Sequence, residues 1–301
     1  MRTLEIRNLS PSRSNLRRVT APFLVSLSLC LALASNLSVA DQQVIADGVA
    51  SPESVARGQD GRLYVSQIGK SGVDGDGSLA VIENGKAKIF AKGLDDPKGI
   101  VAVGPDFYVA DKTRVWKVDA TGTATVFAAA DAFPVKPLFL NDIEASPQGD
   151  LYVSDCGKFV SDGAVFCIKP STKEITVVVS QKTAPQLKAP NGLLFDGNGR
   201  LLLVDFSAGR LYRADLADGK LVELARGVGG ADGLTRDAKG RIYVSDWRGG
   251  KVYVMNSDSD KPKLLLKGFK NAADIFFDAK SGKLLVPDTK AGTITAVSLE
   301  D

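Results

Sequence analysis

Histidine is absent from this 301-residue chain, and sulfur is scarce, with three Cys and two Met. Without histidine the chain cannot form a Ser-His-Asp or Cys-His catalytic arrangement. It also lacks the ligands of a zinc site built from His and Cys. Any catalytic base or metal ligand must therefore come from other side chains, and carboxylates and amides are the first to consider.

An excess of one charge is also missing once the N-terminal segment is set apart. Residues 1–40 contain five Arg and one Glu, which leaves 33 Lys and Arg against 34 Asp and Glu in residues 41–301. The net charge of +3 for the whole chain becomes −1 for this part. A nucleic-acid-binding domain would be clearly basic, so the composition argues against a nucleic-acid partner.

The one extended apolar run lies at 21–34 and follows five Arg residues. It is too short to span a bilayer comfortably. Ser38 and Ala40 then supply small residues at the −3 and −1 positions of a cleavage site before Asp41. The pattern predicts a signal peptide over residues 1–40. We therefore expect an exported protein, periplasmic or secreted, with no membrane attachment after cleavage.

Two cysteines, Cys156 and Cys167, remain in residues 41–301. An oxidising compartment permits a disulfide between them. They flank an expected turn between strands, where simple register does not place them opposite each other. The sequence leaves open whether they are bridged.

Long helical periodicity is missing too, and a repeat of strand-like segments takes its place. A segment that begins at a turn and ends in a short apolar strand recurs at spacings of 44, 44, 50, 41 and 42 residues. This period is in the range of four-stranded propeller blades. The six copies are D-G-R-L-Y-V-S-Q, G-P-D-F-Y-V-A-D, Q-G-D-L-Y-V-S-D, N-G-R-L-L-L-V-D, K-G-R-I-Y-V-S-D and S-G-K-L-L-V-P-D.

The two chain ends predict how the ring closes. The last repeat has three strands and finishes at 293–299, while 43–46 resembles the fourth strand of an earlier repeat, at 221–225. Joining the ends hides the edges that an open sheet would expose. The sequence therefore predicts one all-β domain over residues 41–301. It is a monomeric six-bladed β-propeller whose mature N-terminal strand completes the last blade.

A variable turn precedes the first strand of each repeat. The first strands of propeller blades line the central channel, so these six turns open at one end of it and form a ring of side chains. Loops after the second strands, such as 68–78 and 156–163, lie on the same face. We therefore expect a pocket for a small molecule there. The six ring positions are Glu53, Lys98, Asn141, Asn191, Asp232 and Ala273.

Four ring positions form an oxygen-rich set: Glu53, Asn141, Asn191 and Asp232. Two carboxylates and two amide carbonyls suit a hard divalent cation. Ca²⁺ is the first expectation, with Mg²⁺, Mn²⁺ and Zn²⁺ as alternatives. Taken singly, Asn-Gly and Asp-Gly pairs are also explained by turn geometry.

The Asp that ends each second strand has a structural interpretation. A catalytic residue does not need five copies, so we expect each to accept backbone N–H groups in the turn that follows. Asp142 and Asp274, one position after the ring, are expected to bond amides of their own turns. The first repeat has Gln67 in place of the recurring Asp. The five copies are Asp111, Asp155, Asp205, Asp246 and Asp288.

Four tracts make the chain similar to the gluconolactonase/senescence-marker-protein family of six-bladed propellers. The resemblance covers essentially all of residues 41–301. It implies a divalent metal on the axis, held by Glu53, Asn141, Asn191 and Asp232. It also implies that Asp232 is the general base that activates water against the carbonyl of a lactone or cyclic ester. The tracts are S-P-E-S-V, L-N-D-I-E-A-S-P-Q-G-D-L-Y-V-S-D, P-N-G-L-L-F-D-G-N-G-R and A-D-G-L-T-R-D-A-K-G-R-I-Y-V-S-D.

Two positions depart from the family's pattern. Phe139 stands where the family commonly has a substrate-binding Arg, and Lys98 places an ammonium group in the ring. We expect Lys98, Phe139 and Trp247 to contact substrate. NHL-repeat and strictosidine-synthase-like propellers share the strand pattern, so two alternatives remain. One is a non-catalytic propeller that binds a protein, glycan or small ligand on its loop face, and the other is a lyase that uses Glu53 alone.

Overall fold

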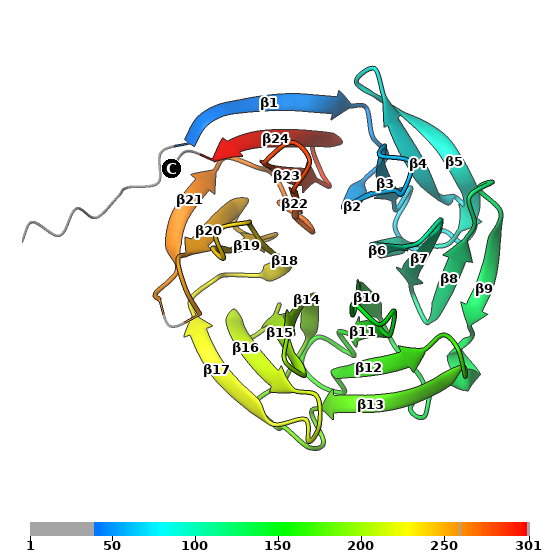
Figure 1. Ribbon diagram of the computed structural model, residues 1–301, viewed down its shortest axis with the longest axis vertical. Helices are drawn as coiled ribbons and strands as arrows, with labels where there is room; N and C mark the ends of the chain where they lie inside the picture. The colour runs from blue at the N-terminus through cyan, green and yellow to red at the C-terminus, as the bar shows by residue number, and fades with distance from the viewer. Residues whose placement is uncertain (1–38, 259, 300–301) are drawn as a thin grey trace, which may run out of the picture. The chain divides into compact units, whose positions relative to one another are not determined.

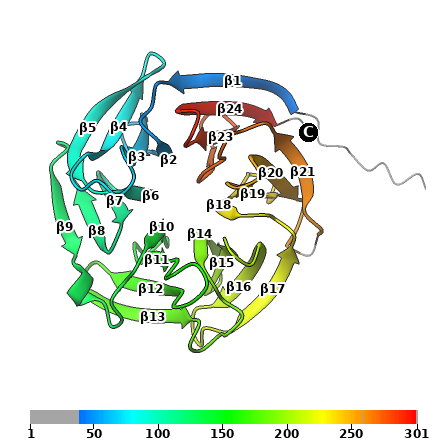
Figure 2. The same cartoon turned by 180° about the vertical axis from the view of Figure 1, so that it is seen from behind.

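Six four-stranded antiparallel sheets stand around a central channel in the computed structural model, which describes residues 39–258 and 260–299 (Figure 1). Figure 2 shows the same ring from behind. The prediction of an all-β six-bladed propeller is confirmed. The described part of the chain has one short 3-10 helix, η1 (Ala130–Ala132), and no helix in it is long and apolar enough to traverse a bilayer.

Each blade runs outward from the channel in chain order, except the last. Blade 1 contains β2 (Pro52–Arg57), β3 (Leu63–Gln67), β4 (Gly77–Glu83) and β5 (Lys86–Leu94). Blade 2 contains β6 (Pro97–Val103), β7 (Asp106–Asp111), β8 (Arg114–Val118) and β9 (Ala124–Ala128). Blade 3 contains β10 (Leu140–Ala145), β11 (Leu151–Asp155), β12 (Ala164–Lys169) and β13 (Glu174–Ser180).

The second half repeats this order. Blade 4 contains β14 (Pro190–Gly197), β15 (Arg200–Asp205), β16 (Arg210–Asp215) and β17 (Leu221–Arg226). Blade 5 contains β18 (Ala231–Arg236), β19 (Ile242–Asp246), β20 (Lys251–Met255) and β21 (Lys263–Lys267). Blade 6 contains β22 (Phe276–Asp278), β23 (Lys283–Asp288), β24 (Thr293–Leu299) and, from the start of the chain, β1 (Val39–Asp47).

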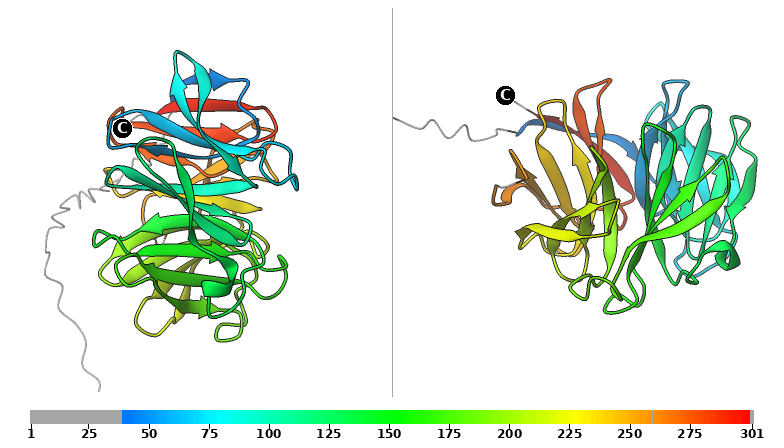
Figure 3. Two further views of the ribbon diagram at one scale, coloured as in Figure 1. Left: turned by 90° about the vertical axis from the view of Figure 1, so that its right-hand side faces the viewer. Right: turned by 60° about the horizontal axis from the view of Figure 1, so that its bottom comes forward.

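Blade 6 joins the two ends of the described chain. β1 pairs antiparallel with β24, in a register that runs from Val39 opposite Leu299 to Asp47 opposite Thr293, and the two lie side by side in Figure 1. Apart from Val39 and Ala40, where β1 begins, the predicted signal peptide lies outside the described residues. Seen from the side, the loops gather on the two faces of the propeller (Figure 3).

The apolar core lies between neighbouring sheets. One buried cluster, for example, combines Tyr108 and Val115 of blade 2 with Leu140, Leu151 and Phe166 of blade 3. The second strands, such as β11, are buried on both faces, which explains their largely apolar sequences. The outermost strand of blade 1, β5, is largely exposed. Packing of this kind holds each inner strand at a fixed distance from the channel axis.

The two cysteines are not bridged. Cys167 lies opposite Tyr152 in the sheet of blade 3, and Cys156 follows β11 in a loop. Both are free thiols, and Cys156 donates a hydrogen bond from Sγ to the carbonyl oxygen of Pro190 at 3.2 Å. This contact joins blade 3 to blade 4.

Candidate functional site

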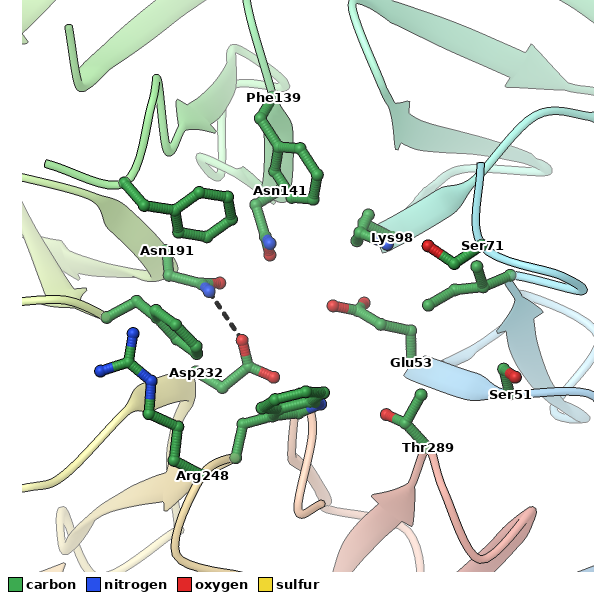
Figure 4. A pocket seen from close by; sticks show the side chains of 14 residues that line it. Ser51, Glu53, Ser71, Lys98, Phe139, Asn141, Asn191, Asp232, Arg248 and Thr289 are labelled. Atoms are coloured by element: carbon green, nitrogen blue, oxygen red, sulfur yellow. Dashed lines mark hydrogen bonds between the residues drawn. The ribbon is translucent and has the colours of Figure 1, made fainter. Parts of the chain in front are cut away.

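A cavity of about 520 Å³ opens at one end of the channel, and every predicted site residue lines it. Glu53, Asn141, Asn191 and Asp232 come from four different blades and point toward one shared space (Figure 4). Lys98, Phe139 and Trp247 also belong to the lining. The four axial side chains, separated by up to 179 positions in the sequence, therefore face a common centre.

The recurring Asp residues hold the ring turns in place. Asp205, the copy in blade 4, accepts hydrogen bonds from the backbone N–H groups of Lys188 and Ala189 at 2.7 and 3.3 Å. These two residues immediately precede Pro190 and Asn191. The copies in blades 2, 3, 5 and 6 accept equivalent bonds, namely Asp111 from Asp95 and Asp96, Asp155 from Leu138 and Phe139, Asp246 from Gly230, and Asp288 from Lys270 and Asn271.

The sequence prediction for these Asp residues was therefore incomplete. Four copies do accept N–H groups from the turn that follows, as Asp205 does from Ser207 and Ala208. Asp111 instead accepts the indole N–H of Trp116 at 2.8 Å. Their second role, fixing the turn that carries the axial side chain, joins residues about 16 positions apart, which a local pattern does not reveal. In blade 1, Gln67 takes this place because its Oε1 accepts the N–H of Ala50 at 3.0 Å.

Asp142 and Asp274 join neighbouring inner strands, which corrects part of the sequence prediction. Asp142 bonds the N–H of Ile143 in its own turn, as expected, but its other oxygen accepts the N–H of Leu193 in blade 4 at 2.6 Å. Asp274 instead accepts the hydroxyl of Ser54 in blade 1 at 2.6 Å. The bonds reach the adjacent blade because the inner strands approach closely at the axis.

Burial and mutual repulsion govern the two axial carboxylates. Glu53 and Asp232 are 4% exposed each. Burial, and then the charge of Asp232, raise the pKa of Glu53 well above its usual range. Burial likewise raises the pKa of Asp232 to about 7, although the amide of Asn191 donates to its Oδ1 at 2.6 Å and works against that shift. Two carboxylates in this position favour a positive charge between them.

Lys98 provides part of that charge. Its ammonium lies 5.4 Å from the ring centroid of Phe139, and its charge lowers the pKa of both Glu53 and Asp232. Figure 4 draws it across the shared space from Asp232. Lys98 thus faces the cavity, where it can contact a bound molecule.

The donor set fits a divalent cation. The Oε2 atom of Glu53 is buried without a hydrogen-bond partner, which leaves a carboxylate oxygen free for an ion. Asn141 and Asn191 supply two further oxygens of the kind that hard cations prefer. Within residues 39–258 and 260–299, no three His, Cys, Asp or Glu side chains are grouped for metal binding, so the axial set depends on its two amides.

Several lining residues were missed by the sequence analysis. Phe206 and Thr289 each directly follow a recurring Asp, as the predicted Trp247 does. Ile68 follows Gln67, which replaces the Asp in blade 1. The N–H of each is bonded to the turn before the inner strand, for example Phe206 to Ala189 at 2.9 Å and Thr289 to Asn271 at 3.1 Å. In blades 1, 4, 5 and 6 this position therefore supplies a second set of pocket side chains, whereas Lys112 and Cys156, at the same position in blades 2 and 3, are not part of the lining. The varied residue types at this position were the signal available.

The other end of the channel holds a second cavity, of about 270 Å³. Its lining includes Asp142, Glu144 and Asp274. Burial, reinforced by the charge of Asp142, raises the pKa of Glu144 to about 8. The channel is therefore acidic along its length, with the candidate site at one end.

The sequence matches a known protein family over most of the propeller. Residues 94–286 match the family described as the SMP-30/Gluconolactonase/LRE-like region. No curated protein matches the sequence.

Solved structures share the fold at low sequence identity. A gluconolactonase from Xanthomonas campestris superposes with a TM-score of 0.70 at 16% identity, over 88% of this chain and 95% of its own. Regucalcin from Agrobacterium tumefaciens, described as a calcium-binding protein, has a TM-score of 0.70 at 18% identity, over 87% of this chain and 94% of its own. A luciferin-regenerating enzyme has a TM-score of 0.69 at 15% identity, over 86% and 95%.

Proposed function

Because the chain belongs to the SMP-30/gluconolactonase/LRE-like family, we propose that it is an exported, metal-dependent hydrolase that opens a lactone or related cyclic ester. The observation that carries the proposal is the convergence of Glu53, Asn141, Asn191 and Asp232 on one space at the pocket floor. These four residues would hold a divalent cation, and Ca²⁺ fits their oxygen donors best. When bound, the cation would supply Lewis acidity toward a carbonyl oxygen.

Asp232 is the proposed general base. A water molecule attacks the lactone carbonyl carbon and gives its proton to Asp232, and the ring C–O bond then breaks. The proton passes to the departing ring oxygen, so the product is a hydroxy acid and Asp232 is regenerated. The charge of the bound cation would lower the pKa of Asp232 from its value of about 7 in the metal-free protein, so that the carboxylate is ionised and can accept the proton. The Asn191 amide keeps the carboxylate oriented through its 2.6 Å hydrogen bond.

Lys98, Phe139 and Trp247 are the proposed substrate contacts. The charge of the Lys98 ammonium lowers the pKa of Asp232 and so would favour the deprotonated form of this carboxyl before reaction. Phe139 and Trp247 border the same cavity and would exclude water from the reacting group.

The proposal is tested by hydrolysis of a panel of lactones. Residues 41–301 are purified, freed of metal with a chelator and assayed for proton release with Ca²⁺, Mg²⁺, Mn²⁺ or Zn²⁺. We expect turnover with at least one metal and none without. Asp232→Asn should lower kcat by about 10²–10⁴-fold at an unchanged melting temperature. The exposed Glu174→Gln should have no effect.

Absence of turnover with all four metals would refute the hydrolase. A non-catalytic propeller that binds a small ligand on this face is then the second candidate. Lys98 and Phe139 favour it, since both face the cavity at positions that depart from the family's pattern. The export expected from residues 1–40 is checked separately, by finding Asp41 at the N-terminus of the protein recovered outside the cytoplasm.

A further inference from the structure

Four aromatic rings stand in series along one wall of the candidate site. Phe139 and Phe159 have ring centroids 5.0 Å apart, Phe159 and Phe206 5.7 Å, and Phe206 and Trp247 6.2 Å. All four are half-buried and line the cavity. They form a continuous apolar wall, here named the aromatic arc, that runs from blade 3 to blade 5.

The scaffold holds these rings in place. The backbone N–H groups of Phe206 and Trp247 are bonded at 2.9 Å to the carbonyls of Ala189 and Gly230, in the turns that carry the axial residues. Phe159 has a φ of 65°, in the left-handed region that a bulky aromatic residue rarely adopts. Strained conformations of this kind persist where the surrounding structure fixes them, and they concentrate at ligand sites.

The opposite side of the cavity carries three hydroxyl side chains beside one apolar residue, Ile68. Ser51, Ser71 and Thr289 line it beside Glu53. The Oγ1 atom of Thr289 is buried without a hydrogen-bond partner, so it remains available to a bound molecule. The pocket therefore has a hydrogen-bonding side next to the reacting centre and an apolar side across from it.

Two cations lie against the arc. The guanidinium of Arg248 lies 4.3 Å from the Phe206 centroid, and the Lys98 ammonium lies 5.4 Å from that of Phe139.

Successive centroid separations of 5.0 to 6.2 Å make the arc longer than a single six-membered ring. A phenyl or fused bicyclic group can therefore lie against it without leaving the apolar wall.

We infer that this pocket takes an aryl-substituted lactone, with the lactone carbonyl toward Glu53 and Asp232 and the aryl group against the aromatic arc. The inference rests on the proposed function and names its substrate class. Water adds to the carbonyl carbon, the ring C–O bond breaks, and the hydroxy acid keeps the aryl group. A polyhydroxylated sugar lactone fits less well, because hydroxyl groups buried against ring faces lose their hydrogen bonds to water.

The test compares γ-phenyl-γ-butyrolactone with γ-butyrolactone, which differ by one phenyl group, and with glucono-δ-lactone. We expect kcat/KM for the phenyl compound to exceed that of γ-butyrolactone by about tenfold or more, as burial of a phenyl group predicts. Phe206→Leu and Phe159→Leu should each reduce this ratio. Phe90→Leu is the matched control, since Phe90 is a half-buried ring outside the pocket that packs against Tyr64.

Equal values for the phenyl and phenyl-free compounds, or a preference for glucono-δ-lactone, would overturn the inference and leave the hydrolase standing. If no lactone turns over, the proposed function fails, and binding decides the inference instead. Calorimetry on Asp232→Asn protein should then show the phenyl compound binding about tenfold more tightly than γ-butyrolactone. Equal affinity, or no binding of either compound, would overturn it. Melting curves of each Leu variant exclude unfolding as the cause.

Discussion

At the residue scale, the role of an aspartate in this chain depends on its position within the repeat. Asp232 faces the cavity, with its charge uncompensated apart from Lys98 and the Asn191 amide. Asp205, fully buried, instead accepts four backbone N–H groups, from Lys188, Ala189, Ser207 and Ala208. The first arrangement leaves a carboxylate available for chemistry, and the second uses it to hold the backbone.

Replacing Asp205 with Ala should lower the free energy of unfolding by about 3 kcal/mol, because buried N–H groups lose their acceptors. Urea unfolding followed by circular dichroism measures the change. Asp218→Ala is the control, since Asp218 accepts one N–H in an exposed turn, and it should cost less than about 0.5 kcal/mol. Equal effects of the two substitutions would show that the recurring Asp does not hold the turn.

Glu144 predicts a pH dependence of stability. Burial raises its pKa from 4.5 to about 8, so between these values the folded protein keeps a proton that the unfolded chain releases. Stability from this group is thus fully present below about pH 4.5 and is lost as the pH rises toward 8. Glu144→Gln cannot ionise, so it should be more stable than the wild type at pH 8 and similar at pH 4.

At pH 8 we expect the free energy of unfolding of Glu144→Gln to exceed that of the wild type by about 1–2 kcal/mol. This is less than the full pKa shift of Glu144 implies, because its side chain is half-buried and partly screened by solvent. Urea unfolding at pH 4, 6 and 8 measures it. The exposed Glu174→Gln should follow the wild type at every pH. If the free energy of unfolding of Glu144→Gln changed with pH in the same way as that of the wild type, the raised pKa of Glu144 would be contradicted.

Sequence reasoning found the axial residues better than the pocket wall. Glu53, Asn141, Asn191 and Asp232 share one slot in an aligned repeat, so their convergence followed from the fold. Phe206 and Thr289 occupy a second slot, directly after the recurring Asp. The loops after the second strands were expected on the pocket face, but among the residues of this slot only Trp247 was predicted to contact substrate. Hydrogen bonds that cross between turns, such as that of Phe206 to Ala189, bring this second slot to the cavity.

At the element scale, the inner strands approach each other so closely that some positions accept only glycine. A Cβ on Gly192 of β14 would lie 2.3 Å from the carbonyl oxygen of Asp232 in β18, and one on Gly233 would lie 2.3 Å from the backbone nitrogen of Ile275. The Asn-Gly and Asp-Gly pairs lie within β14 and β18, and neither glycine has a positive φ, so close packing of the inner strands explains them better than turn geometry does. Because the residue after the axial one is glycine, the inner strand of the next blade can approach within contact distance.

Gly192→Ala should accordingly lower the free energy of unfolding by about 3 kcal/mol, since backbone cannot move aside as a side chain can. It should also weaken the candidate site, because Asn191 and Asp232 border the contact. Thermal and urea unfolding measure the first effect.

The control is Gly240→Ala, at a positive φ of 83° in open space, where conformational strain alone should cost about 1 kcal/mol. If both variants lose the same stability, the close approach of β14 and β18 is not a constraint on the fold.

At the scale of the whole molecule, the ring could be predicted because blade packing imposes a period on the sequence. Second strands buried on both faces read as apolar runs, and these recur every 41 to 50 residues. Substrate class could not be predicted in the same way. It depends on side chains such as Phe159, whose place in the aromatic arc results from the local backbone of one loop.

The ring also explains how a chain without histidine can build a reactive centre. Each blade contributes one side chain to the axis, and the low polarity around Glu53 and Asp232 raises their pKa values. Because two buried carboxylates repel each other when both are ionised, a cation bound between them stabilises the ionised forms. The central claim is that Glu53, Asn141, Asn191 and Asp232 bind one divalent ion together.

Calorimetric titration of metal-free protein with Ca²⁺ tests this claim most directly. We predict one ion per chain for the wild type, and an affinity reduced by about 100-fold or more in Glu53→Gln and in Asp232→Asn, since each loses a charged ligand. Glu174→Gln should bind as the wild type does. Absence of binding of Ca²⁺, Mg²⁺, Mn²⁺ or Zn²⁺ to the wild type, or unchanged binding in both axial variants, would contradict it.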